Sequence, residues 1–139
     1  MARAGAGVIA IVAALVEDEQ GRLLLVRKRG TSAFMQPGGK IEPGEDPLAA
    51  LQREIAEELG AGIVPGSAVF LGEYEAPAAN EPGCRVRAAL YRVRLVGAIA
   101  IGAEIVEGVW ARPAAAARLP LAPLTRDVVL PLAEGAGQA

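Results

Sequence analysis

Apolar runs separated by short polar or glycine-containing segments organise most of this chain. An apolar run over residues 7–16 predicts a long central strand buried on both faces. A polar turn over residues 17–21 connects it to a second strand over residues 23–26, and we expect the two to form a hairpin. Alternating or apolar segments predict further strands over residues 34–35, 68–74, 85–95 and 105–110.

Turn and helix signals lie between the first strands and the later ones. Residues 30–33 are turn-like, and Pro37-Gly38-Gly39 should break regular structure. Asp46 is a suitable N-cap, and Pro47 suits the first helical position. We therefore predict a helix over residues 47–59, ended by Gly60 in a left-handed conformation.

The remaining segments complete one compact unit. Residues 76–83 carry two prolines and an asparagine and should form a loop. Short helices are expected over residues 114–119 and 125–132, followed by a frayed tail over residues 134–139. A length of 139 residues fits a single domain over residues 1–139, and the order of elements predicts an α/β fold with a mixed sheet between helices.

Charge and composition exclude several classes of function. The net charge is −2, with 14 basic and 16 acidic residues, so no broad field favours a nucleic acid polymer or an anionic membrane. The chain has no histidine, which rules out Ser-His-Asp hydrolysis and HExxH zinc chemistry. Its single cysteine, Cys84, cannot form an intramolecular disulfide, which suits a cytoplasmic protein. The apolar run at the start is too short to cross a bilayer.

Three glutamates gather on one side of the predicted helix. At about 100° per residue, Glu54, Glu57 and Glu58 share a sector beside the apolar stripe. Like charges four residues apart, here Glu54 and Glu58, destabilise a helix by about 0.2–0.5 kcal/mol. Glu57 and Glu58 also lie near the C-terminus of the helix, where anions oppose the helix dipole. A divalent cation such as Mg²⁺ between the carboxylates would account for the cluster. Taken alone, three glutamates on a helix favour an ordinary solvated face over a metal site.

The surrounding residues resemble a known motif. The pattern G-x5-E-x7-R-E-U-x-E-E-x-G-U, in which U is a bulky aliphatic residue, is the Nudix box. The chain is similar to it over Gly39-x5-Glu45-x7-Arg53-Glu54-Ile55-Ala56-Glu57-Glu58-Leu59-Gly60-Ala61. Its single departure is Ala61, which is smaller than the usual final residue. The resemblance implies the family's α/β/α sandwich.

The resemblance also implies site residues. Glu54, Glu57 and Glu58 would bind Mg²⁺ or Mn²⁺, and the carbonyl of Gly38 would complete part of the metal shell. Arg53 and Glu45 would support the site by joining the glycine loop to the helix, although a purely structural ion pair is an equal alternative. The implied activity is hydrolysis of a diphosphate linkage by water attack at phosphorus. The general base stays open, with candidates Glu54, Glu81, Glu104 and Glu107.

Several residues outside the acidic cluster are candidates for contacts with the substrate. Arg27, Lys28 and Arg29 could face phosphates, or they could be a solvated basic loop. Gly39, Asn80 and Glu81 are further candidates, and the polar Gln36 before Pro-Gly-Gly could face a ligand.

The expected substrate is a small nucleotide-like diphosphate, either a nucleoside triphosphate or an ADP-ribose-like molecule. Pro77, 16 residues beyond the box, resembles a marker of the ADP-ribose branch. A catalytically silent nucleotide-binding or sensor module is the rival class, and a purely structural domain is a third. A homodimer is compatible with the resemblance, although no interface can be identified from the residues.

Overall fold

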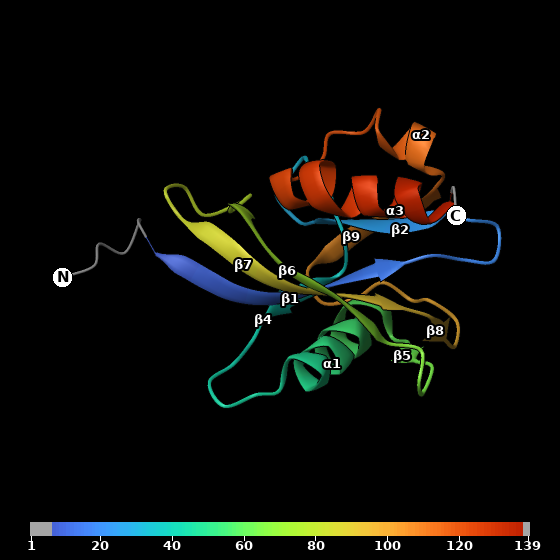
Figure 1. Ribbon diagram of the computed structural model, residues 1–139, viewed down its shortest axis with the longest axis horizontal. Coiled ribbons are helices and arrows are strands. Elements are labelled where there is room, and N and C mark those ends of the chain that lie inside the picture. Colours follow the sequence, from blue (N-terminus) through green and yellow to red (C-terminus); the bar gives the residue numbers. More distant parts are fainter. Residues whose placement is uncertain (1–6, 138–139) are drawn as a thin grey trace.

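The computed structural model describes residues 7–137, in which a mixed four-stranded sheet forms the centre of the molecule (Figure 1). Its strand order is β4-β1-β7-β6. Strand β1 (Val8–Val16) runs parallel to β7 (Arg85–Val93) along its whole length, with Val12 opposite Ala89. The outer strands β4 (Gly38–Lys40) and β6 (Val69–Pro77) are antiparallel to their neighbours.

A second, antiparallel sheet has the order β3-β2-β9. It contains β3 (Phe34–Met35), β2 (Leu23–Lys28) and β9 (Ile105–Ala111). A small pair is formed by β5 (Gly62–Ile63) and β8 (Leu95–Val96). The strands are thus divided among three sheets, of which the largest is the mixed sheet expected from the sequence.

Helices cover both sides of this arrangement. In Figure 1, α1 (Pro47–Leu59) lies below the strands, while α2 (Pro113–Ala116) and α3 (Leu130–Gly137) lie above them. A π-helical turn, η2 (Thr125–Val129), leads directly into α3. The caps of α1 are those predicted: the Asp46 side chain accepts from the backbone N–H groups of Leu48 and Ala49, and Gly60 has a left-handed φ of 62°.

The unbroken apolar sequence of β1 reflects burial on both faces. Val12, Ala14 and Val16 enter the core beneath α1, which also contains Leu51 and Ile55 of that helix. Ala13 and Leu15 enter the opposite core, together with Leu130 and Ala133 of α3. Successive residues of one strand therefore contribute to both layers, as an α/β/α sandwich requires.

The predicted hairpin between the first two strands is wrong. Strand β1 has β4 on one side and β7 on the other, so neither edge is left for β2. A single antiparallel bridge between Glu17 and Leu23 connects the two segments, and β2 pairs with β3 and β9 instead. The two strands therefore belong to different sheets.

Other boundaries also differ from the predictions. Gly38 and Gly39, expected to break regular structure, form β4, because β1 supplies their hydrogen-bonding partners. The loop predicted over residues 76–83 begins later, since β6 continues to Pro77 by pairing with β7. The strand predicted over residues 85–95 is two strands, β7 and β8, that belong to different sheets.

The C-terminal elements are shifted from their predicted positions. The helix expected over residues 114–119 is the shorter α2, and the one expected over residues 125–132 begins as η2 and continues as α3. The tail predicted over residues 134–139 is helical up to Gly137, because Ala133 packs in the core and anchors this last helix. Residues 138–139 lie outside the described part of the chain.

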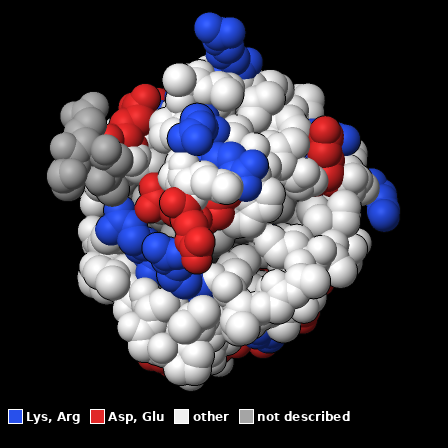
Figure 2. Space-filling view, turned by 90° about the vertical axis from the view of Figure 1, so that its right-hand side faces the viewer, with Lys and Arg blue, Asp and Glu red and all other residues white. Residues whose placement is uncertain are grey.

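Charges of opposite sign are mixed on the face shown in Figure 2, where acidic and basic side chains lie next to one another. This face therefore has no broad field of a single sign. Within residues 7–137, none of the helices has the length and hydrophobicity needed to cross a membrane.

Candidate active site

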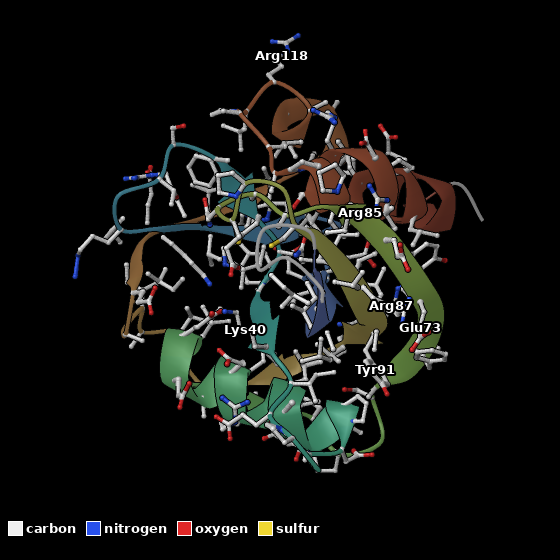
Figure 3. The ribbon with its side chains drawn as sticks, turned by 90° about the vertical axis from the view of Figure 1, so that its left-hand side faces the viewer. Lys40, Glu73, Arg85, Arg87, Tyr91 and Arg118 are labelled. Carbon is white, nitrogen blue, oxygen red and sulfur yellow. The ribbon has the colours of Figure 1, made fainter. Side chains whose placement is uncertain are left out.

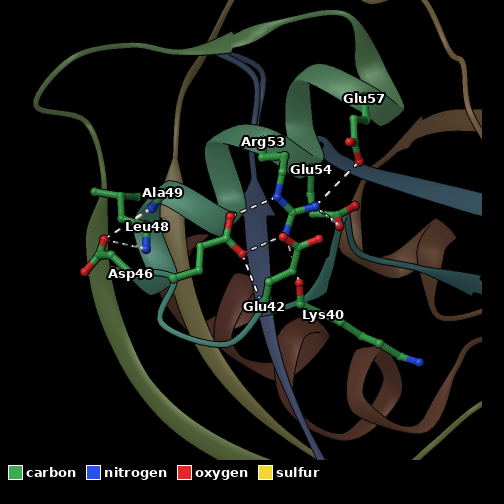
Figure 4. Close-up of polar contacts among 9 residues, drawn as sticks. Lys40, Glu42, Asp46, Leu48, Ala49, Arg53, Glu54 and Glu57 are labelled. Atoms are coloured by element: carbon green, nitrogen blue, oxygen red, sulfur yellow. Dashed lines mark hydrogen bonds and ion pairs between the residues drawn. The ribbon is translucent and has the colours of Figure 1, made fainter.

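Arg53 of α1 is the centre of an ion-pair network that joins the helix to the preceding loop (Figure 4). Its Nε and Nη2 donate to the two carboxylate oxygens of Glu45 at 2.9 and 2.8 Å. Nη2 also donates to the carbonyl of Lys40 at 3.1 Å, and the backbone N–H of Glu42 donates to Glu45 at 3.0 Å. One guanidinium thus fixes both ends of the loop between β4 and α1.

The same guanidinium faces two of the three clustered glutamates. Nη1 donates to Glu54 Oε2 at 2.9 Å and lies 3.7 Å from Glu57 Oε1. The double hydrogen bond from Arg53 lowers the pKa of Glu45 to about 2. Burial raises the pKa of Glu54 above its usual value, while the hydrogen bond from Arg53 lowers it in part. Arg53 therefore supports Glu45 and Glu54 as anions.

Glu58 has a different environment on the inner side of α1. The residue is only 5% exposed, and its carboxylate accepts one long hydrogen bond, from the backbone N–H of Gly38 at 3.4 Å. Burial raises the pKa of Glu58 to about 7; Lys28 opposes this shift, and Glu54 adds to it. A buried carboxylate with so little hydrogen bonding is unfavourable as an anion unless a cation approaches it.

Two glycines allow β4 to lie against both β1 and α1. Gly38 has a φ of 146°, and a Cβ there would collide with the backbone of Val12 and Ala13. A Cβ at Gly39 would overlap the carboxylate of Glu54. The first glycine is needed for the sheet, and the second leaves room for an acidic side chain of the site.

The glutamates line a cleft with a volume of about 540 Å³. Its walls come from the end of β2, from β4, from α1 and from the loops that precede β7 and β9. The lining residues are Lys28, Arg29, Thr31, Gly39, Lys40, Glu54, Glu57, Glu58, Asn80, Glu81, Ala103 and Glu104. The cleft thus combines acidic groups from one helix with basic groups from two strand ends.

A second, apolar pocket of about 120 Å³ adjoins this cleft. Ile11, Val12, Met35, Val86 and Leu124 contribute to its walls. Five residues line both spaces, so the apolar pocket and the charged cleft form one continuous site. These shared residues are Lys28, Gly39, Lys40, Asn80 and Glu81.

The structure brings most of the residues predicted from the sequence together. The three glutamates, Gly39, Arg29, Asn80 and Glu81 all line the cleft, and so does Glu104. Gly38 lies beside it through its contact with Glu58. Arg53 and Glu45 form the ion pair described above at its edge.

Arg27 and Glu107, also predicted, lie elsewhere. Arg27 Nε donates to Glu107 at 2.9 Å, and its Nη1 donates to the carbonyl of Thr31 at 2.8 Å. The two residues face each other across β2 and β9, and neither lines the cleft. Neighbouring residues of a strand point to opposite sides, so Arg27 cannot follow Lys28 into the cleft.

Lys40 lines the cleft but was not singled out in the sequence. Its Nζ lies 3.5 Å from Glu81, and Figure 3 shows it beside α1. Its position directly after Gly39 is the signal that could have identified it. The Arg85 and Arg87 side chains, also labelled in Figure 3, lie away from α1 and pair with Glu75 of β6.

The donor atoms suit a hard divalent cation, since Glu54, Glu57 and Glu58 offer carboxylate oxygens. Buried Glu58, with its single long hydrogen bond, is the strongest indication that a cation fits. Among residues 7–137, no three acidic groups already converge as a metal cluster, because Glu54 and Glu57 point toward Arg53. Glu57, with a side chain 55% exposed, has the freedom to turn toward a cation.

The sequence of the chain matches the family model of the NUDIX domain over residues 8–132. The chain belongs to the NUDIX domain family. This match extends from β1 into α3 and therefore includes every element that lines the site. The family's α/β fold, expected from the sequence, is confirmed.

Two curated relatives are similar over part of this NUDIX chain. An RNA pyrophosphohydrolase of Halorhodospira halophila is 41% identical over 61 residues, which cover 44% of this chain and 33% of that protein. An 8-oxo-dGTP diphosphatase of Haemophilus influenzae is 37% identical over 57 residues, which cover 38% of this chain and 42% of that protein. The chain thus matches less than half the length of either relative.

Solved structures are similar over nearly the whole length. The ORF135 protein of E. coli has a TM-score of 0.74 and 28% identity, covering 100% of this chain and 96% of that one. A MutT NUDIX hydrolase from Burkholderia pseudomallei has a TM-score of 0.77 and 24% identity, covering 89% and 96%. The second comparison shows the shared fold alone.

Proposed function

We propose that this NUDIX protein is a metal-dependent hydrolase that cleaves a diphosphate linkage in a small nucleoside diphosphate derivative. The observation that carries the proposal is the buried carboxylate of Glu58 beside Glu54, in a cleft that also contains Lys28 and Arg29. Anionic groups suited to a cation and cationic groups suited to phosphate share one space. The names of the two curated relatives support the same reaction class.

Glu54, Glu57 and Glu58 would hold Mg²⁺ or Mn²⁺, with the Gly38 carbonyl as a further ligand. Such an ion, when bound, neutralises the phosphate oxygens and orients a water molecule for attack at phosphorus. Lys28 and Arg29 would bind phosphate oxygens, and Arg29 offers a planar fork of N–H donors for this. Arg53 and Glu45 would keep Glu54 in place without touching the substrate.

A carboxylate must accept the proton of the attacking water. Glu54, Glu81 and Glu104 line the cleft and are the candidates for this general base. Glu107, the fourth candidate from the sequence, pairs with Arg27 outside the cleft and is set aside. Glutamine variants of the three lining residues, compared for kcat, would identify the base.

The adjoining apolar pocket favours a nucleotide over inorganic diphosphate. With phosphates in the charged cleft, a base would enter the pocket because the two spaces share five lining residues. Pro77 lines this pocket. ADP-ribose-like substrates and nucleoside triphosphates both carry a base that would enter it, so the position of Pro77 does not separate the two classes. The balanced charge favours small molecules over an RNA polymer.

The test measures phosphate or diphosphate release with Mg²⁺ or Mn²⁺ from a panel of substrates. The panel contains nucleoside triphosphates, 8-oxo-dGTP, ADP-ribose and a 5′-triphosphorylated RNA. We expect turnover of at least one small nucleotide, and a loss of most activity in Glu58→Gln with the fold retained. Glu73→Gln, on β6 away from the cleft, is the matched control.

Two results would contradict the proposal. Equal rates in wild type and Glu58→Gln would remove Glu58 from the site. Binding of nucleotides without turnover of any of them would favour the silent sensor module. The homodimer and the cytoplasmic location considered from the sequence stay predictions, and sedimentation velocity would check the first.

A further inference from the structure

A buried polar pair lies at the apolar pocket. Gln36, between β3 and β4, is 7% exposed, and Thr125, the first residue of η2, is fully buried. Thr125 Oγ1 donates to Gln36 Oε1 at 2.6 Å. This hydrogen bond connects the strand layer to the C-terminal helical layer, and Thr125 thereby fixes one end of the Gln36 amide.

The other end of the amide is uncommitted. Gln36 Nε2 carries two N–H donors and makes no hydrogen bond to any residue in the described range 7–137. Gln36 also lines the apolar pocket. Nε2 is not among the fully buried polar atoms of the described residues that lack a partner, so it reaches the open space of the pocket, where an acceptor on a ligand would meet it.

The rest of the pocket makes Gln36 the distinguishing group. Its charged lining residues, together with Asn80, also line the cleft and so lie toward the phosphate side. Away from the cleft, the walls are apolar residues such as Ile11, Val86 and Leu124. In such a pocket one well-placed polar side chain decides which ligand binds.

Building on the proposed function, we infer that Gln36 selects the base of the substrate, with Thr125 as its positioning residue. Nε2 donates to a ring carbonyl, such as the O6 atom of guanine. Adenine carries an amino donor at the equivalent atom, so two donors would face each other and neither would find an acceptor in this contact. The site therefore favours bases with a carbonyl at this edge over adenine.

Thr125 holds the amide in the orientation that the structure shows, through the bond from its hydroxyl to Oε1. While its hydroxyl donates to Oε1, only the amino end of the Gln36 side chain is left for the ligand. Without the hydroxyl, the amide can rotate and offer either end, which would relax the choice between carbonyl-bearing and amino-bearing bases.

Binding of non-hydrolysable α,β-methylene triphosphates tests the inference without turnover. Calorimetry with Mg²⁺ would compare the guanosine and adenosine analogues. We expect wild type to bind the guanosine analogue about tenfold more tightly, the effect of one hydrogen bond to a buried base edge. Gln36→Met keeps the size of the side chain but removes the donor, and should bring the two affinities to within about twofold.

Thr125 variants provide the second measurement. Thr125→Val keeps the shape of the residue and should lower the ratio of kcat/KM for GTP over ATP about tenfold, through KM, with kcat for GTP unchanged. Thr125→Ser retains the hydroxyl and should restore the ratio. If Thr125 had a merely structural role, Thr125→Val would lower kcat/KM equally for GTP and ATP and would lower the melting temperature. This result would overturn the assignment.

Failure of the inference can be separated from failure of the proposed function. If the two analogues bind with the expected ratio of affinities but GTP is not hydrolysed, the role of Gln36 stands and the proposed hydrolase activity is rejected. Hydrolysis with equal affinity for both analogues, or an unchanged ratio in Gln36→Met, would reject the role of Gln36 alone. Binding of neither analogue would overturn it as well.

Discussion

Arg53 holds both carboxylate oxygens of Glu45, at 2.9 and 2.8 Å, across the loop that separates β4 from α1. A third N–H group of the same guanidinium donates to Glu54. The residue that positions the loop is therefore also the residue that positions a carboxylate of the cleft. Substitutions at Arg53 or Glu45 should therefore alter the site, although neither side chain would contact the substrate.

Arg53→Lys should reduce activity while the fold is retained. Lysine keeps the charge but cannot donate to Glu45 and Glu54 at once, because it lacks the planar fork of donors. Loss of a partner behind metal ligands typically costs about 10- to 100-fold in metal affinity or activity. Titration of activity with Mn²⁺ would show the midpoint moving to higher concentration. An unchanged midpoint would separate Arg53 from the metal site.

Glu45→Gln should destabilise the protein in a pH-dependent way. The pKa of Glu45 is about 2 in the folded protein against an ordinary 4.5, because Arg53 stabilises the carboxylate. The folded state therefore binds this proton less readily than the unfolded state does. The ion pair stabilises the fold above about pH 4.5, and its contribution is lost as the pH falls toward about 2.

Urea unfolding at several pH values would check this sign. The gap between the free energies of unfolding of wild type and Glu45→Gln should be largest near neutral pH and should close in acid. A gap that widens as the pH falls would contradict the assigned direction of the shift.

Gly38→Ala should destabilise the fold by about 2–3 kcal/mol or more. The residue has a φ of 146°, and a Cβ would collide with the backbone of Val12 and Ala13, which cannot move without disturbing β1. Gly66→Ala is the matched control, since Gly66 has a φ of 79° and open space around it. Left-handed strain alone costs about 1–2 kcal/mol. Equal losses in thermal or urea unfolding would show that the close approach of β4 to β1 adds nothing.

Gly39→Ala should impair activity more than stability. A Cβ there would meet the carboxylate of Glu54, and the flexible end of that side chain can move away. The fold should therefore survive, while Glu54 leaves its place near Arg53. We expect a melting temperature close to wild type and a strong fall in kcat. A proportionate fall in melting temperature and in kcat would indicate that Gly39 has a role in folding only.

Arg29→Ala and Arg27→Ala should differ, although the two residues are close in sequence. Arg29 lines the cleft, whereas Arg27 is committed to Glu107 and the Thr31 carbonyl. Arg29→Ala should raise KM about tenfold or more with a smaller effect on kcat, as expected for a lost phosphate contact. Arg27→Ala should leave KM near the wild-type value. A larger KM effect at Arg27 would reverse the assignment.

Local signals in the sequence predicted the parts of the site that depend on one element. Helical periodicity alone brings Glu54, Glu57 and Glu58 to one side of α1, and the caps at Asp46 and Gly60 define its ends. The face of the sheet to which the Arg27 side chain points was not predictable in the same way. It depends on which strand pairs with β2 and in which register.

Long-range pairing explains the remaining errors. The parallel partner of β1 is β7, which lies far along the chain, and no local pattern distinguishes it from β2. Strand β4 consists of two glycines and a lysine, residues with little preference for strands, and is extended only because β1 binds it. Thr125 could not be connected to Gln36 from the sequence, because their contact spans 89 positions.

Strand β1 sends its side chains alternately into the two cores. Neither helical layer can therefore be redesigned on its own: enlarging Ala13 would displace the layer of α3, and enlarging Ala14 would displace α1 and with it the acidic cleft. Any attempt to thermostabilise this protein through its interior would have to treat this strand as a shared wall and conserve volume on both of its faces together.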